Sequence, residues 1–106
     1  MKGTNLREFE ELVLLTITAL MDDAYSVAIC GEISHLAGRS VEIGAAHAAL
    51  NCLEEEGHVK SQLGEATKTR GSERNIFYQP TISGMATLVR ARSIHDHLGD
   101  RIPSLV

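Results

Sequence analysis

The sequence contains no tryptophan, only four aromatic residues and only two cysteines among its 106 residues. Cys30 and Cys52 have no Cys-x-x-Cys spacing, so they predict neither a disulfide framework nor a zinc site, and we expect both thiols to be reduced. The scarcity of aromatic side chains indicates a small core, and a small domain with little core is often completed by a second subunit. The composition therefore favours a dimer.

Long apolar runs and targeting signals are also missing. No apolar stretch approaches the roughly 20 residues that span a bilayer. The N-terminal segment places acidic residues directly ahead of its apolar run and has no small-residue cleavage site, unlike a secretory signal. We therefore expect a cytoplasmic protein with no membrane segment, folded as one domain over residues 1–106.

Charge is distributed unevenly along the chain, although the net charge is only −4. Residues 1–56 carry three basic and ten acidic residues, a balance of −7, whereas residues 57–92 carry six basic and two acidic residues, a balance of +4. A basic segment is the part of a chain suited to phosphate. Any contact with nucleic acid is therefore expected in the second segment.

The apolar periodicity predicts two helices in the N-terminal part. Between Leu6 and Leu20 apolar residues recur at steps of three and four, and further leucines widen the apolar stripe. A helix that is apolar on more than one face is expected to be buried on two sides, by its own domain and by a partner. Asp22 and Asp23 are predicted to cap a second helix that ends at Gly38. The inward residues predicted for this helix are Tyr25, Ile29, Ile33 and Leu36.

A third helix, a hairpin and a fourth helix follow. The spacing from Ile43 to Leu53 predicts a helix that stops at Gly57, and alternation over 58–63 predicts a strand whose outer side carries His58. Residues 75–79 form a second short strand that Pro80 ends, so the two runs make a hairpin with a long polar tip. From Thr81 a fourth helix is predicted, with one apolar stripe formed by Met85, Leu88, Ala91, Ile94 and Leu98.

This order of elements is that of a winged helix-turn-helix domain. The fold class predicted is mostly α with a small β-hairpin. Residues 5–80 would form the winged helix-turn-helix, and residues 81–99 an added C-terminal helix for dimerisation.

Four segments in this order resemble the PadR family of transcriptional regulators, over nearly the whole chain from Leu6 to Leu98. They are FEELVLLTI in the first helix, DDAYSVAICGEI entering the second, GRSVEIGAAHAALNCLEEEGHV through the third, and FYQPTISG after the hairpin. The resemblance implies a repressor that binds DNA as a dimer. Residues 43–56 would be the recognition helix in the major groove, and residues 58–79 the wing along phosphates or the minor groove.

The resemblance also implies a set of contact residues. Lys68, Arg70 and Arg74 lie in a glycine-containing polar loop, where cations can neutralise phosphates. The fourth helix would pack across a two-fold axis against the first helix of the partner, and the dimer would bind an inverted repeat. A small-molecule effector at the dimer seam is compatible with this arrangement. The residues predicted to contact DNA are Arg39, Ser40, His47, Asn51, Lys60, Lys68, Arg70 and Arg74. The residues predicted at the seam are Phe9, Val13, Met85, Leu88, Ile94 and Leu98.

The sequence departs from the family pattern on the predicted recognition helix. His47 stands where the family usually has a tyrosine, and Cys52 and Glu56 stand where basic residues are frequent. The predicted exposed face has almost no side chain able to pair with a base edge. This leaves an alternative function, a winged-helix protein-interaction module that has lost specific DNA binding. The face in question is formed by Ala45, Ala48, Ala49, Asn51 and Cys52.

Nothing in the sequence predicts an enzyme, a metal or a cofactor. His95 and His97 alternate on a helix, so their side chains point apart and do not form a metal site. The consecutive glutamates 54–56 are scattered around a helix end. The chain has neither a phosphate-binding loop nor a dinucleotide fingerprint.

Overall fold

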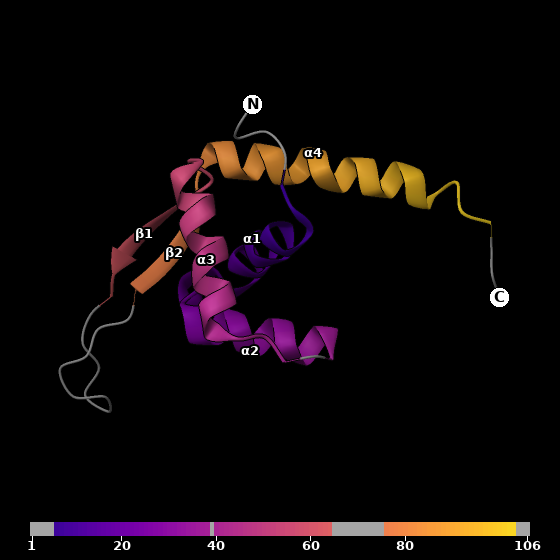
Figure 1. Ribbon diagram of the computed structural model, residues 1–106. Helices are drawn as coiled ribbons and strands as arrows, with labels where there is room; N and C mark the ends of the chain where they lie inside the picture. Colours follow the sequence, from indigo (N-terminus) through magenta and orange to yellow (C-terminus); the bar gives the residue numbers. More distant parts are fainter. Residues whose placement is uncertain (1–5, 39, 65–75, 104–106) are drawn as a thin grey trace.

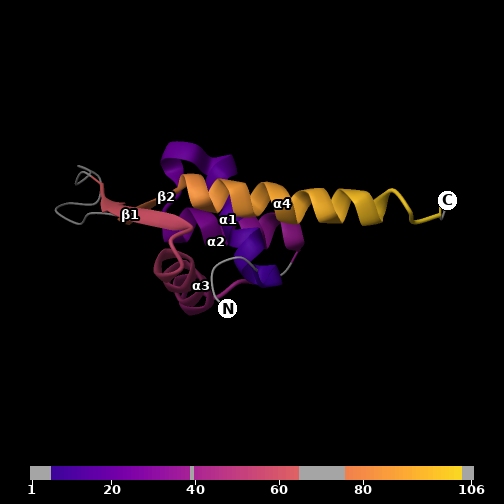
Figure 2. The ribbon, with the colours of Figure 1, turned by 90° about the horizontal axis from the view of Figure 1, so that it is seen from above.

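The computed structural model describes residues 6–38, 40–64 and 76–103. It confirms the predicted fold class, because helices dominate and the two strands form one antiparallel hairpin (Figure 1). The wing strands and the C-terminal half of the last helix project from opposite ends of the body in both views (Figures 1 and 2). The elements are α1 (Glu8–Leu20), η1 (Met21–Asp23), α2 (Ser26–Ala37), α3 (Ile43–Glu55), β1 (Val59–Leu63), β2 (Ile76–Pro80) and α4 (Ile82–Gly99).

Helix α1 lies at the centre of the core and packs against α2, α3, α4 and β2. Val13, Leu14 and Ile17 are fully buried on the side of α1 that meets these elements. The wide apolar stripe read from the sequence is therefore divided. One part is core, and the other part is only half-buried at the surface. The half-buried residues packed against the core include Leu6, Phe9, Leu12, Leu15 and Leu20.

The junction between α1 and α2 differs from the prediction. Asp22 and Asp23 do not cap α2 but form an exposed 3-10 turn with Met21, and Tyr25 is the residue that precedes the helix. The chain is held in this turn because Tyr25 bridges to Phe77 of β2 and stacks on its ring edge-to-face, with ring centroids 5.5 Å apart. The predicted helix end at Gly38 is confirmed, with a left-handed φ of 68°.

Two apolar residues of the predicted helical spacings are exposed. Leu36 is 74% exposed because the last turn of α2 projects beyond the start of α3 (Figure 1). Ile43 is 45% exposed because it occupies the first turn of α3, ahead of the part that packs on α1. Ile29, Ile33, Leu50 and Leu53 are buried as predicted. The helical periodicity therefore predicts which face of each helix is buried. It does not predict how far toward the helix ends that face stays buried.

The joint between α3, the wing and α4 is built around His58. The chain turns at Gly57, with a positive φ of 80°, and the backbone N–H of His58 donates to the carbonyl of Leu53 at 2.8 Å. The His58 side chain, predicted on the outer side of the strand, is fully buried. Its carbonyl accepts from the backbone N–H of Thr81 at 2.9 Å, and the Thr81 hydroxyl donates to the carbonyl of Gly57 at 2.6 Å. These bonds tie the start of α4 to the end of α3.

Strand β2 extends one residue further than predicted. Pro80 is its last residue and pairs with Val59, opposite the start of β1. A proline has no backbone N–H to donate to a neighbouring strand. It fits at this position because both strands of a two-stranded hairpin are edge strands. The antiparallel register then runs outward to the pair of Leu63 and Ile76.

Tyr78 of β2 lies at the edge of the core, 8% exposed, and its pKa is raised above 10.0 by burial and, to a lesser extent, by the nearby carboxylate of Glu54. A raised folded-state pKa contributes stability below the unfolded pKa, and this stability is lost as the pH rises through the folded value. We therefore expect the free energy of unfolding to fall above about pH 10 more steeply in the wild type than in Tyr78→Phe. Urea unfolding of both proteins from pH 8 to pH 11 measures the difference. Parallel pH profiles would contradict this assignment.

Candidate DNA interface and subunit seam

Helix α3 presents a polar pair on a face of small residues. His47 and Asn51 are exposed and lie one turn apart, so they share a side of the helix. Ala45 and Ala48 are also exposed, whereas Ala49, predicted on the same surface, is buried in the core. An Asn side chain can form a bidentate contact with adenine, and small neighbours let a helix approach base edges closely. The structure therefore leaves His47 and Asn51 free to meet a ligand surface.

Of the basic residues predicted to contact DNA, only Lys60 lies among the described residues. Lys60 is exposed on β1, opposite Gln79 of β2. Ser40 is exposed just before α3. The remaining predicted DNA contacts lie outside the described residues; they are Arg39, Lys68, Arg70 and Arg74. The described part of the candidate interface thus consists of the α3 pair, Ser40 and Lys60.

The acidic end of α3 has a structural role that sequence reasoning missed. The Glu54 carboxylate accepts a hydrogen bond from the Ser61 hydroxyl at 2.7 Å, and so connects the end of α3 to β1. Glu56 lies 3.7 Å from the buried imidazole of His58. Two of the three consecutive glutamates therefore face the wing and its joint. Nothing in a run of identical residues indicates which of them will do so.

The two thiols differ in environment. Cys30 is buried in α2 and burial raises its pKa, whereas Cys52 is half-buried on α3. Thiolates are the reactive species, so a buried thiol with a raised pKa reacts slowly. We expect a thiol-specific chromogenic disulfide at neutral pH to modify Cys52 at least about tenfold faster than Cys30. Cys52→Ser should lose the fast phase and Cys30→Ser should keep it. A fast phase that follows Cys30 would contradict the assignment.

The predicted subunit seam needs two corrections. Val13 is fully buried and Leu88 only 4% exposed, because both pack inside the protomer between α1 and α4. Met85 does not share one side of α4 with the other residues of the predicted apolar stripe. Ile94 follows it by nine residues, or two and a half turns, so the two side chains lie on opposite sides of α4. Steps of three residues drift around a helix, and the five predicted positions therefore do not form one face.

Phe9, Ile94 and Leu98 remain available at the seam. Ile94 is 60% and Leu98 55% exposed, and both belong to the C-terminal half of α4. The same face of α4 is buried nearer its start, at Gly84 and Thr87. A second subunit would bury the exposed part of such an apolar helix face.

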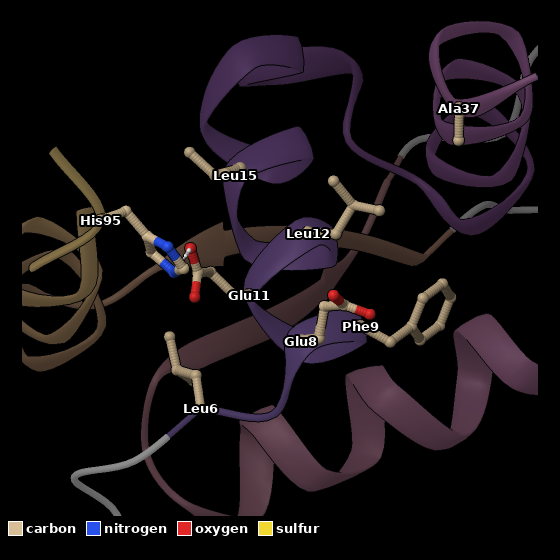
Figure 3. Close-up of a pocket in the computed structure, with 8 residues that line it drawn as sticks. All are labelled: Leu6, Glu8, Phe9, Glu11, Leu12, Leu15, Ala37 and His95. Carbon is tan, nitrogen blue, oxygen red and sulfur yellow. Dashed lines mark ion pairs between the residues drawn. The ribbon is translucent and has the colours of Figure 1, made fainter. Parts of the chain in front are cut away.

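A groove beside α1 adjoins this open face. It has a volume of about 650 Å³ and lies between α1, the end of α2 and α4 (Figure 3). The imidazole Nε2 of His95 faces the carboxylate Oε2 of Glu11 across the groove at 3.4 Å (Figure 3). His95 therefore pairs with α1 rather than with His97. The residues that line the groove are Leu6, Glu8, Phe9, Glu11, Leu12, Leu15, Ala37 and His95.

Within residues 6–38, 40–64 and 76–103, no group of three or more His, Cys, Asp or Glu side chains is placed to hold a metal ion. Over the same part of the chain, no helix has both the length and the apolar character needed to cross a membrane.

Comparison with known proteins identifies the fold. No protein-family model matches the chain, and no curated protein matches it significantly. Among solved structures, a PadR-family transcriptional regulator from Eggerthella lenta DSM 2243 is similar with a TM-score of 0.68 and 23% identity, over 88% of this chain and 80% of that one. A PadR-family regulator from Clostridium difficile R20291 gives 0.69 and 18%, over 87% and 92%. RosR from H. salinarum gives 0.67 and 21%, over 97% and 84%.

These similarities cover most of the chain, and they confirm the resemblance stated from the sequence at the level of the fold. The chain has the winged helix-turn-helix fold of PadR-family transcriptional regulators, with the additional C-terminal helix.

Proposed function

We propose that this protein is a dimeric, DNA-binding transcriptional regulator of the PadR type, acting as a repressor. The observation that carries the proposal is the exposed face of α3, on which His47 and Asn51 lie side by side. The similarity to transcriptional regulators over most of both chains supports it. In this function α3 enters the major groove, and the wing cations Lys68, Arg70 and Arg74 neutralise phosphates.

Two copies would be joined through the seam. The exposed Ile94 and Leu98 of one α4 would lie in the groove beside α1 of the partner subunit, whose walls are mostly apolar. A two-fold axis makes this contact twice, so each α4 would be covered. The two recognition helices would then meet successive major grooves of an inverted repeat, with half-sites about 34 Å apart.

Substitutions on α3 test DNA recognition. We expect Asn51→Ala to weaken binding to the specific operator by about tenfold, because it removes a bidentate base contact, and to leave binding to a scrambled duplex unchanged. Ser83→Ala, an exposed change outside α3, is the matched control. Fluorescence anisotropy with both duplexes gives the two affinities. Equal losses on both duplexes, or none on either, would show that Asn51 does not contact bases.

Substitutions on α4 test the seam. We expect the double variant Ile94→Asp with Leu98→Asp to dissociate the seam and to weaken operator binding by at least a hundredfold, since both half-sites must be occupied together. Each side chain is more than half exposed in the protomer, so the fold should persist. Sedimentation velocity measures the assembly, and circular dichroism checks the helix content. Unchanged assembly would place the seam elsewhere.

The acidic character of α3 favours a second candidate function, a winged-helix protein-interaction module. Glu54 and Glu55 are exposed at the C-terminal end of the helix, where carboxylates repel a phosphate backbone. Such a module would keep its partner when Lys68, Arg70 and Arg74 are reversed to glutamate. A DNA-binding regulator would lose DNA with the same change, so this variant separates the two functions.

A further inference from the structure

The wing is attached to the body of the protein through both of its strands. On β2, the backbone N–H of Tyr78 donates to the carbonyl of Ala24 at 2.9 Å, close to the start of α2. On β1, the Ser61 hydroxyl donates to the carboxylate of Glu54, in the last turn of α3, at 2.7 Å. Among the described residues, this is the only hydrogen bond that joins β1 to an element other than β2. Each helix of the helix-turn-helix therefore holds one strand of the wing.

Glu54 lies where the packing of the wing ends. Ser61 pairs with Tyr78 across the hairpin, and Tyr78 is buried. The next pair on the same face, Leu63 with Ile76, is 65% and 46% exposed. The Glu54 carboxylate is close to both members of the inner pair. It accepts from Ser61, and it adds to the burial that raises the pKa of Tyr78. The bond from Glu54 therefore acts at the point from which the outer part of the wing projects.

We propose that Glu54 is a positioning residue, which holds the wing at a fixed angle to α3 so that both can contact DNA together. This role rests on the proposed function, because it takes α3 and the wing as the two DNA contacts. Hydrogen bonds to a carboxylate are short and about twice as strong as neutral ones. A wing without this bond has to be ordered when DNA binds, and that ordering weakens the affinity.

The charge of Glu54 and its hydrogen bond have opposite effects on DNA binding. An exposed carboxylate about 10 Å from a phosphate lowers the affinity only about twofold, because water screens the repulsion. Loss of a hydrogen bond to a charged group costs more than this. Substitutions that separate the charge from the bond should therefore change the affinity in opposite directions.

Glu54→Gln and Glu54→Ala make this separation. Glutamine removes the charge but keeps an oxygen that accepts from Ser61, so we expect the affinity for DNA to rise about twofold. Alanine also removes the acceptor and should weaken binding about fivefold. It should also reduce the slope of log affinity against log salt, because phosphate contacts of the wing are lost. Fluorescence anisotropy with the duplex upstream of the protein's own coding sequence measures both quantities. Equal affinities of the two variants would overturn the proposal, since Glu54 would then act only through its charge.

Glu55 provides the matched control. It is the neighbouring exposed carboxylate in the last turn of α3, and the hydrogen bond to β1 is made by Glu54 instead. Glu55→Gln and Glu55→Ala should both raise the affinity about twofold, because each removes only a charge. If Glu55→Ala weakened binding as much as Glu54→Ala, the bond to the wing would not be the cause and the proposal would be wrong.

The donor of the bond gives a second test. Ser61→Ala should weaken DNA binding about fivefold, and the double variant with Glu54→Ala should bind no more weakly than Ser61→Ala alone. Both side chains are exposed, so these variants should keep the fold, which circular dichroism checks. Losses that add up in the double variant would show that the two residues act independently.

Pulsed electron paramagnetic resonance measures the angle of the wing without DNA. Spin labels are attached at Gln62→Cys on β1 and Ala48→Cys on α3, both exposed positions, after the two native cysteines are replaced by serine. We expect a narrow distribution of distances in this protein and in its Glu54→Gln variant. The distribution should be broad in Glu54→Ala and in Ser61→Ala. An unchanged narrow distribution in Glu54→Ala would overturn the proposal.

The measurements with and without DNA separate this role from the proposed function. If the wild type does not distinguish the upstream duplex from a scrambled one, the proposed function is wrong, and the distance distributions still decide whether Glu54 holds the wing. If the wild type binds specifically and Glu54→Ala broadens the distribution without loss of affinity, the proposed function stands and the positioning role of Glu54 in DNA binding is wrong.

Discussion

Gly84→Ala is expected to lower the free energy of unfolding by about 3 kcal/mol, although alanine is the better helix former. Gly84 lies in the first turn of α4, directly against the backbone of His58. A Cβ added at this glycine would collide with the His58 carbonyl oxygen and lie 2.8 Å from its carbonyl carbon. These are backbone atoms, so no side-chain rotation relieves the collision.

The collision would open the joint between α3, the wing and α4. The same His58 carbonyl accepts from the Thr81 backbone N–H, and the Thr81 hydroxyl accepts from the N–H of Gly84 at 2.9 Å. Moving α4 away breaks this set of bonds. We therefore expect DNA affinity and dimerisation to fall together in Gly84→Ala, because the joint orients both surfaces.

Gly31→Ala provides the matched control. Gly31 lies within α2, is exposed, and has no atom within 4 Å of an added Cβ. This change should stabilise the protein by up to about 1 kcal/mol, which is the ordinary helix propensity difference. Urea unfolding should therefore give a lower free energy of unfolding than the wild type for Gly84→Ala and a higher one for Gly31→Ala. A Gly84→Ala protein as stable as the wild type would show that α4 does not approach His58 so closely.

Removing the wing cations is expected to have the largest effect on DNA binding. Replacing Lys68, Arg70 and Arg74 together by alanine should lower the slope of log affinity against log salt by about 2 to 3 in magnitude. Each cation that contacts a phosphate releases about one counterion, so three such contacts account for this change. At low salt the affinity should fall by at least about a hundredfold for the specific and the scrambled duplex alike, because phosphates carry no sequence information.

Arg101→Ala is the control for this experiment. Arg101 is exposed and follows the C-terminal end of α4, which lies away from α3 and the wing strands (Figure 1). Its loss should leave the salt slope unchanged. A triple variant with the wild-type slope would show that these cations do not contact phosphates. The candidate interface would then be limited to His47, Asn51, Ser40 and Lys60.

Much of the fold could be predicted from the sequence because its helices are strongly periodic. The bounds of α3 and α4, the turn at Gly57 and the hairpin follow from apolar spacing and glycine positions. Asp22 and Asp23 were misassigned because a capping residue type was present, while the bridge from Tyr25 to Phe77 fixes the helix start at Ser26. That bridge joins residues about fifty positions apart, and local propensity contains no information about it.

The candidate site was less predictable for a related reason. Periodicity distinguishes an apolar face from a polar one, but it does not show what covers that face. Val13 and Leu88 were assigned to a partner and are covered by their own protomer. Met85 is predicted at the seam but lies on the opposite side of α4, where it lines a hollow together with Met21 of η1. The close approach of α4 to the His58 backbone at Gly84 is likewise something that no spacing in the sequence indicates.

Specific DNA binding by this winged-helix protein is tested most directly by fluorescence anisotropy with a duplex from the region upstream of its own coding sequence. The measurement is made at low and moderate salt and against a scrambled duplex. We expect tighter binding to the upstream duplex than to the scrambled one, and a steep loss of affinity with salt. Equal affinity for the two duplexes, or an affinity independent of salt, would contradict the claim and favour the protein-interaction module.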